Sequence, residues 1–283
     1  MAADQQVPRI LHMTCPGSAV PPALQANIDA LRDANPGWQL KLHTDADIDR
    51  FVQDRCDARI QRAYSRLNPA YGAARADLFR YLVLHLDGGA YLDMKSTCER
   101  PLDDIAKAQG GFLLAQWDNA AGERHESWGF EDTPVDLPGG SFIQWFLLSR
   151  PGHPFLQAAI AHVVSRIEAY SPLRDGVGKQ AVLRVTGPIA FTEAILPLLN
   201  RVPHQRHRRF TECGLVYSIF ERDNQSTRHR GTFGTHYSLL DEPLTRLGPG
   251  ERMAWKSLQL ARRVMGPIRG TLSMNARTGK TKP

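Results

Sequence analysis

The stretch from Tyr71 to Asp93 constrains the fold more than any other part of this 283-residue sequence. Its first part carries apolar side chains at positions i, i+3, i+4 and i+7 of a helix: Phe79, Leu82, Val83 and Leu86. Asp77 and Arg80 are three residues apart and share a different face. They form either an intrahelical ion pair or a ligand-binding pair. A buried ion pair adds little net stability, which favours ligand binding.

A double glycine follows this helix and predicts where it ends. Gly88 and Gly89 accept the left-handed backbone conformation that terminates helices. The next three residues, Ala90 to Leu92, are typical of a short buried strand. Asp93 then stands at the carboxyl end of that strand, which is the end where open α/β sheets bind ligands.

The rest of the chain alternates between expected strands and helices, so we expect an α/β fold. Thr44 is the expected N-cap of one helix. The long polar segment 118–140 is expected to be a functional loop. Strands are expected at 8–13, 38–43, 112–117 and 215–220, helices at 21–35, 45–51, 55–66, 154–170 and 189–199, and either a strand or a helix start at 141–149.

The charge distribution separates a tail from the body. The chain carries +6 overall, but residues 246–283 hold nine Lys or Arg and one acid, a net of +8, which leaves about −2 for the preceding 245 residues. We therefore expect a catalytic domain at 1–245 and a basic amphipathic tail at 246–283, with the last dozen residues disordered. The tail either packs on the body or contacts an anionic membrane. No nucleic-acid-binding motif is found, so we expect no nucleic-acid partner.

Further features indicate a cytoplasmic protein. No run of 18 or more apolar residues is present, so we expect no membrane-spanning helix. The N-terminus has no basic and apolar regions of a signal peptide. The cysteines have neither paired nor metal-type spacing, and we expect reduced thiols at Cys15, Cys56, Cys98 and Cys213.

The central motif resembles the sugar-binding "DXD" region of glycosyltransferase family 32. It is Asp77-Leu-Phe-Arg80-Tyr81, followed by Gly88-Gly89-Ala-Tyr91-Leu-Asp93-Met-Lys95. The resemblance extends over about residues 7 to 240 through other landmarks: Pro8-Arg-Ile-Leu-His12, Asn35-Pro36-Gly-Trp38, Pro101-Leu102, His153-Pro154-Phe155, Thr186-Gly187-Pro188 and His236.

This resemblance implies a GT-A fold, in which a mainly parallel central sheet is flanked by helices. It also implies a retaining glycosyltransferase that moves a sugar from a UDP- or GDP-sugar donor to the hydroxyl of a glycan or lipid-linked acceptor. The expected setting is capsule or lipopolysaccharide synthesis at the cytoplasmic face of the membrane.

The resemblance also assigns roles to individual residues. Asp77 and Arg80 match the residues that grip the donor sugar and its phosphate, and Asp93 matches the first carboxylate of the motif. His12 ends the first strand, where the family approaches the donor base. His236 is a candidate metal or phosphate ligand, although a lone histidine is as often a core or surface residue. Tyr81 and Tyr91 are expected to be core aromatics.

Lys95 departs from the family pattern, because the second motif carboxylate is expected at its position. That carboxylate normally helps to hold Mn²⁺ or Mg²⁺, which prefer hard oxygen ligands. Two outcomes stay open at this point. Lys95 replaces the metal as a fixed charge on the diphosphate, or Asp93 and His236 still hold a metal with the help of water.

Two alternatives to a polysaccharide glycosyltransferase stay open from the sequence. One is a non-catalytic module that binds a nucleotide-sugar or glycan and has lost the second carboxylate. The other is a toxin-like enzyme that glycosylates a protein. Turnover of a nucleotide-sugar donor separates the non-catalytic module from both enzymes.

Overall fold

The chain divides into two units in the computed structural model, Met1–Arg246 and Leu247–Pro283. The structure describes residues 6–17, 19–130, 137–221 and 236–265. The expected disorder of the last dozen residues lies outside the described part of the chain. Each unit is considered by itself below.

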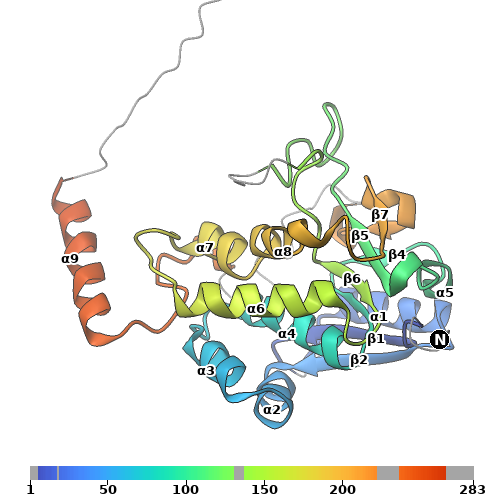
Figure 1. Ribbon diagram of the computed structural model, residues 1–283, viewed down its shortest axis with the longest axis horizontal. Helices are drawn as coiled ribbons and strands as arrows, with labels where there is room; N and C mark the ends of the chain where they lie inside the picture. Colours follow the sequence, from blue (N-terminus) through green and yellow to red (C-terminus); the bar gives the residue numbers. More distant parts are fainter. Residues whose placement is uncertain (1–5, 18, 131–136, 222–235, 266–283) are drawn as a thin grey trace, which may run out of the picture. The chain divides into compact units, whose positions relative to one another are not determined.

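A six-stranded sheet forms the centre of the first unit (Figure 1). Its strand order is β2-β1-β3-β6-β5-β7. β6 pairs antiparallel with both β3 and β5, and the remaining pairs are parallel. The mainly parallel α/β sheet predicted from the sequence is therefore confirmed. The strands are β1 Ile10–Cys15, β2 Gln39–Thr44, β3 Gly89–Leu92, β5 Phe112–Ala115, β6 Phe146–Ser149 and β7 Gln205–His207.

Helices cover both faces of this sheet. Ala90 and Leu92 of β3 belong to a core cluster that includes side chains of α1, whereas the intervening Tyr91 lies under the Arg80 guanidinium of α4. In Figure 1, α6 lies in front, with α7 and α8 above it and α4 behind it, and α6 packs against both α4 and α8. The helices are α1 Pro22–Ala34, α2 Asp45–Arg55, α3 Ala58–Arg66, α4 Gly72–Leu86, α5 Leu102–Ile105, α6 Pro154–Glu168, α7 Gly178–Val185 and α8 Pro188–Ile195.

The glycine turn between α4 and β3 forms as predicted. Gly88 and Gly89 have φ values of 69° and 98°, a region that side chains other than glycine rarely adopt. A Cβ atom on Gly88 would stand 2.6 Å from Pro151 Cδ, and one on Gly89 would overlap the carbonyl oxygen of Ile10. The turn is therefore so closely packed that only glycine fits, and it sets the point at which β3 begins.

Local sequence signals predicted most element ends correctly, and one failed. Thr44 forms a capping box with Asp47 at the start of α2, and segment 141–149 contains the strand β6. The strand expected at 215–220 is wrong in extent. Only Leu215–Val216 is extended (β8), paired with Thr97–Cys98 (β4), and a 3₁₀ turn follows at Ile219–Glu221.

Several short elements were not predicted, α7 and β7 among them. α7 has only eight residues, too few for a clear helical period. β7 lies in the basic island 201–209, whose polar composition hides a strand that pairs with β5.

One segment of the first unit, Gly178–Leu198, is long and apolar enough to cross a membrane. This differs from the expectation that no such segment exists. The segment consists of two helices, α7 and α8, which meet at Gly187, and 56% of its apolar window is buried inside the fold. Core helices of folded domains pass the same test of length and composition, so the finding is weak evidence for a span.

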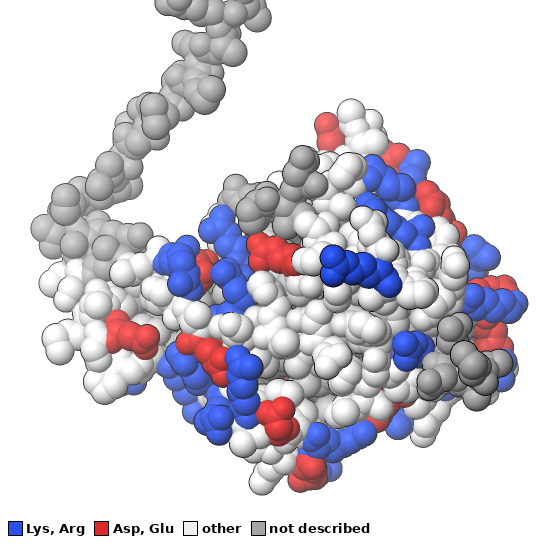
Figure 2. Space-filling view, viewed as in Figure 1, with Lys and Arg blue, Asp and Glu red and all other residues white. Residues whose placement is uncertain are grey.

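Surface charge on the first unit is mixed. Figure 2 shows Lys and Arg interspersed with Asp and Glu over the body. Several of these charges are paired across helices, such as Arg59 with Glu168 and Arg55 with Asp87. This mixture fits the near-neutral charge that the sequence assigns to residues 1–245.

The second unit contains the helix α9, Pro249–Met265. Met253 and Leu260 are exposed on it, at 70% and 63%. They are seven residues apart and therefore share one helical face. Arg252 and Lys256 are also exposed on this helix. The tail thus contains a helix with exposed apolar and basic side chains, and its amphipathic character stays a prediction.

Candidate active site

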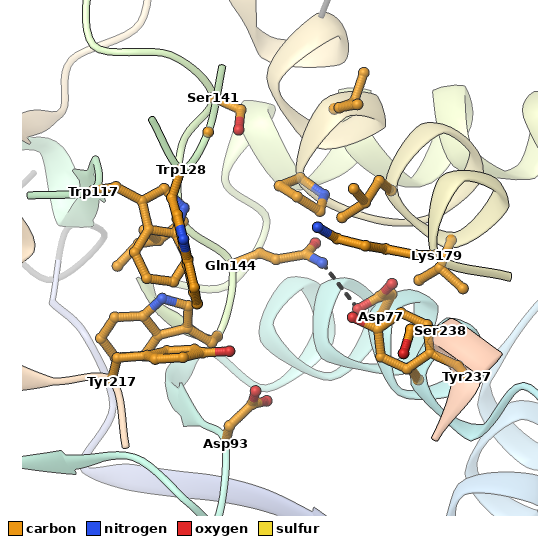
Figure 3. Close-up of a pocket in the computed structure, with 18 of the residues that line it drawn as sticks. Asp77, Asp93, Trp117, Trp128, Ser141, Gln144, Lys179, Tyr217, Tyr237 and Ser238 are labelled. Carbon is orange, nitrogen blue, oxygen red and sulfur yellow. Dashed lines mark hydrogen bonds between the residues drawn. The ribbon is translucent and has the colours of Figure 1, made fainter. Parts of the chain in front are cut away.

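A cavity of about 620 Å³ lies at one edge of the central sheet (Figure 3). The carboxyl end of β3 supplies Asp93 and Lys95, and the carboxyl end of β5 supplies Trp117. Gln144 and Trp145 reach the same edge because β6 runs in the opposite direction and begins there. The cavity therefore occupies the ligand-binding edge predicted for Asp93.

The sequence-predicted residues converge on this cavity with one exception. Five of the six candidates line it: Asp77, Arg80, Asp93, Lys95 and His236. His12 does not line it. Other lining residues come from α7, α8, the segment around Tyr217 and the 3₁₀ turn Tyr237–Leu239.

Arg80 is buried and holds several parts of the site together. Its Nη1 donates to the carbonyl oxygen of Gln144 at 2.7 Å. Its Nη2 lies 3.2 Å from Asp77 Oδ1 and 3.4 Å from Asp93 Oδ1, and the guanidinium stacks over the ring of Tyr91. Burial alone would lower the pKa of Arg80, but Tyr91, Asp93 and Asp77 outweigh it and raise the pKa above its usual value. The guanidinium is therefore a permanent cation at the base of the cavity.

Asp77 is fully partnered inside the protein. Thr186 Oγ1 donates to its Oδ2 at 2.8 Å, and Gln144 Nε2 donates to its Oδ1 at 3.0 Å. Burial raises the pKa of Asp77 to about 6, against the opposing effect of Arg80. Asp77 and Arg80 thus form the intrahelical ion pair, and both also line the cavity, so their part in ligand binding stays a prediction.

Lys95 stands beside Asp93 with its ammonium held by an aromatic ring. Nζ donates to Tyr217 Oη at 2.9 Å, lies 4.2 Å from the centre of that ring, and is 4.0 Å from Asp93 Oδ2. Burial works to lower the pKa of Lys95, but Tyr217 and Asp93 outweigh it, so the pKa is raised and the side chain is charged. Asp93 is therefore flanked by a cation on each carboxylate oxygen.

An aromatic wall that the sequence did not assign to the site faces these charges. We use this name for Trp117, Trp128, Trp145 and Tyr217, which all line the cavity. Their rings contact one another edge to face or tilted, with centres 4.9 to 6.1 Å apart. The only sequence signal for it was the long segment 118–140, which carries Trp128. The contact between β5, β6 and the segment around Tyr217 is a tertiary property that a single sequence does not reveal.

His12 is buried in the sheet, and both of its ring nitrogens bond to groups inside the protein. Its Nε2 lies 3.1 Å from the carbonyl oxygen of Gly88 and its Nδ1 lies 3.0 Å from His43 Nε2. Because a carbonyl oxygen only accepts, Nε2 carries the proton and Nδ1 accepts from His43. Burial and the neighbouring His43 lower the pKa of His12 to about 4. The structure therefore gives His12 a neutral, packed role away from the cavity.

The residues around Asp93 do not fit a divalent cation. Its oxygens face Arg80 and Lys95, and these two cations would repel a metal ion. Among the described residues, no group of three or more His, Cys, Asp or Glu side chains is placed to hold a metal. His236 does line the same cavity, but its Nδ1 accepts from Ser238 Oγ at 2.7 Å.

The mainly parallel sheet, with its acidic and basic cluster at the carboxyl edge, has the arrangement that the resemblance to a GT-A fold implies. Residues 21–110 match the protein-family model described as "Glycosyltransferase sugar-binding region containing DXD motif". The resemblance inferred from the sequence is confirmed over these residues, which match the sugar-binding region of this glycosyltransferase family. The matched segment includes Asp77, Arg80, Asp93 and Lys95, whereas His12 and His236 lie outside it.

Named relatives are glycosyltransferases at modest identity. The chain is 26% identical over 164 residues to inositol phosphoceramide mannosyltransferase 1 of Schizosaccharomyces pombe, which covers 55% of this chain and 42% of the relative. It is 28% identical over 171 residues to the initiation-specific alpha-1,6-mannosyltransferase of Candida albicans, covering 52% and 43%. The chain thus spans less than half the length of these relatives. The solved structure of PaToxG glycosyltransferase is similar with a TM-score of 0.47 and 15% identity, covering 93% of this chain and 88% of that chain.

The neutral, buried state of His12 predicts an acid-sensitive contribution to stability. The pKa of His12 is lower in the folded state, about 4, than its ordinary value of 6.5. The unfolded chain therefore takes up the proton first, so this contribution is fully present above pH 6.5 and is lost as the pH falls towards 4, by up to about 3 kcal/mol. Urea unfolding of wild type and His12→Asn at pH 7.5 and pH 5 measures it. We expect a smaller loss of unfolding free energy in the variant, since the other titrating groups are shared. Equal losses in both proteins would contradict the role given to His12.

Proposed function

We propose that this protein is a retaining glycosyltransferase that moves a sugar from a nucleoside diphosphate sugar to an acceptor hydroxyl. The observation that carries the proposal is the Lys95 ammonium beside Asp93, at the DXD position of the matched family and inside a large cavity. A diphosphate needs a cation, and sugar hydroxyls need carboxylate acceptors. The two side chains supply both within 4.0 Å of each other.

The leaving group defines what Lys95 does. When the bond between the sugar C1 and the diphosphate oxygen breaks, negative charge grows on the diphosphate, and a fixed cation there stabilises the transition state. Lys95 has three N–H donors, and Tyr217 orients the ammonium by accepting one of them. The remaining donors can hold diphosphate oxygens. This is the charge-replacement alternative for Lys95, and it needs no metal ion.

The other charged residues position and receive the sugar. Asp93 accepts hydrogen bonds from donor-sugar hydroxyls. Arg80, whose N–H groups contact Asp77, Asp93, Tyr91 and backbone oxygens, acts as a positioning residue. The acceptor oxygen forms the new bond to C1 on the face that the diphosphate leaves. Its proton passes to the departing diphosphate oxygen, so the products are the glycoside and the protonated nucleoside diphosphate.

The acceptor is proposed to be a glycan or lipid-linked saccharide at the cytoplasmic face of a membrane, in cell-surface polysaccharide synthesis. Two observations support a membrane setting. A relative is named for mannosyl transfer to inositol phosphoceramide, which is a lipid. Residues 246–283 carry a net charge of +8, and α9 exposes Met253 and Leu260 beside basic side chains. Basic residues near an anionic surface each contribute about 1 kcal/mol to binding.

Asp93→Asn tests the sugar-binding carboxylate. We expect donor turnover, measured as nucleoside diphosphate release, to fall by roughly 100-fold because a neutral amide is a weaker acceptor at the reacting sugar. Stabilisation by UDP or GDP in a thermal-shift assay should persist, since Lys95 holds the diphosphate. Asp104→Asn, an exposed carboxylate on α5, is the control. Unchanged turnover in Asp93→Asn would remove the site assignment. Donor binding without any wild-type turnover would favour the non-catalytic module.

A manganese titration separates the fixed cation from a metal. We expect wild-type turnover to be insensitive to EDTA and to added Mn²⁺. Lys95→Ala should lose about 100-fold in turnover, and Lys95→Asp should regain part of it only with Mn²⁺, because two carboxylates then offer hard oxygen ligands. Lys107→Asp, an exposed lysine on the surface, controls for charge reversal. A wild-type rate that EDTA abolishes and Mn²⁺ restores would instead support a metal held by Asp93 and His236.

The basic tail is tested by vesicle binding. The full chain should sediment with phosphatidylcholine vesicles only when they contain about a third phosphatidylserine, and less so in high salt. Arg252→Glu/Lys256→Glu should weaken this binding, whereas Arg32→Glu/Arg50→Glu, the same charge change at exposed sites of the body, should not. Equal binding by both double variants would rule out the tail as the contact.

A further inference from the structure

The residue that precedes Trp128 of the aromatic wall has a strained backbone. Ser127 has φ of 65°, and it is the one non-glycine residue with positive φ in the described part of the chain. It directly precedes Trp128. Hydrogen bonds hold the segment there: Trp128 N donates to the carbonyl oxygen of His125 at 2.9 Å, and Asn119 Nδ2 donates to that of Trp128 at 2.6 Å. Strained conformations persist where the surroundings fix them, and they cluster at functional sites.

Trp128 leaves part of its ring open at the cavity. Its side chain is 38% exposed, whereas Trp145 of the same wall is 4% exposed. Trp117 and Tyr217 contact the Trp128 ring at interplanar angles of 68° and 83°, so neither covers its face by stacking. Figure 3 shows Trp128 beside Trp117 and Tyr217 on one side of the cavity, opposite Lys179 and Tyr237. The strained backbone at Ser127 thus holds the Trp128 ring where its exposed part can offer a flat apolar surface to a ligand.

A second observation calls for a ligand oxygen at this wall. The indole N–H of Trp145 is buried and has no acceptor among the described residues. Buried N–H groups are almost always paired, so the Trp145 N–H is a spare donor in a residue that lines the cavity. A pyranose ring offers both features that the wall needs, since its C–H face is apolar and its hydroxyl and ring oxygens accept hydrogen bonds.

Proximity to Lys95 indicates which sugar binds. Tyr217 belongs to the wall and also accepts the Lys95 hydrogen bond at 2.9 Å. The wall therefore adjoins the diphosphate and the reacting C1, provided that the proposed function holds. The nucleobase is joined to the diphosphate through a ribose, and we place it away from Lys95 and from the wall. The donor sugar is held on the carboxylate side, by Asp93. The ring that lies against the wall is then the acceptor.

We propose that Trp128, supported by Trp117 and Tyr217, is the platform for the acceptor sugar ring of the reaction proposed above. The acceptor class is accordingly a pyranoside, bound by stacking of its C–H face on the indole. The Ser127 backbone sets the height and tilt of the platform. Specificity for a ring-shaped acceptor follows, because an open-chain polyol offers no flat face to the indole.

Kinetics of a Trp128 series test the platform. The assay measures donor hydrolysis without acceptor, and transfer to methyl pyranosides of mannose, glucose and galactose, with mannitol as the open-chain probe. Trp128→Ala should raise the KM for the best methyl pyranoside by about tenfold or more, and by a larger factor than it changes the KM for the donor. Trp128→Phe should recover most of the loss. Phe130→Ala, an exposed aromatic two residues away that does not line the cavity, is the matched control.

Other outcomes overturn the proposal. A rise in the KM for the donor with an unchanged KM for the acceptor would show that the wall binds the donor. No change in either KM would contradict the platform. Melting temperatures of all variants exclude misfolding as the cause. Tryptophan fluorescence, titrated with methyl pyranosides in the presence of UDP or GDP, measures the platform even if the wild type shows no turnover. Fluorescence quenching that is lost in Trp128→Phe would support the platform. Because this titration needs no turnover, failure of the platform can be distinguished from failure of the proposed function.

Discussion

The buried guanidinium of Arg80 is the interaction on which the rest of the site depends. It contacts two carboxylates, a tyrosine ring and the Gln144 carbonyl oxygen, and so it ties α4, β3 and the start of β6 together. A buried cation is tolerated only when its partners are complete, and removing one partner of such a pair is strongly destabilising. The same network places Asp93 at the cavity. Stability of the fold and geometry of the site therefore rest on one side chain.

The sequence was informative where the physics is local. Helical period and backbone sterics predicted a helix that ends at Gly88 and Gly89, a strand after it, and Asp93 at the end of that strand. The structure has all three. Three of the five cavity-lining candidates, Asp77, Arg80 and Asp93, come from this one stretch, and Lys95 follows it by two residues. Its chain connectivity alone keeps them close.

Residues brought together by tertiary packing could not be predicted in the same way. Gln144 and Thr186 share Asp77 as their acceptor, although they lie 67 and 109 positions away from it in sequence. Tyr217, 122 positions from Lys95, is unremarkable in sequence, and its role appears only through the hydrogen bond to the ammonium. The proposed place of His12 at the donor base had the opposite difficulty. The sequence placed His12 at the end of the first strand, but β1 continues to Cys15, so His12 lies inside the strand and bonds within the sheet.

A lysine at position 95, where the family pattern has a carboxylate, balances the charges of this network. The formal charges of Asp77, Arg80, Asp93 and Lys95 sum to zero. With an aspartate in place of Lys95 they would sum to −2, and a divalent cation would return the site to zero. The two arrangements therefore present the same total charge to a diphosphate, one with a metal ion and one without. Adding a metal to the present site would instead leave two uncompensated positive charges in a partly desolvated cavity, which is unfavourable. On this argument the role proposed for Lys95 is that of a substitute for the metal, and the Tyr217 ring beside its ammonium would take the place of the ligands that orient the ion.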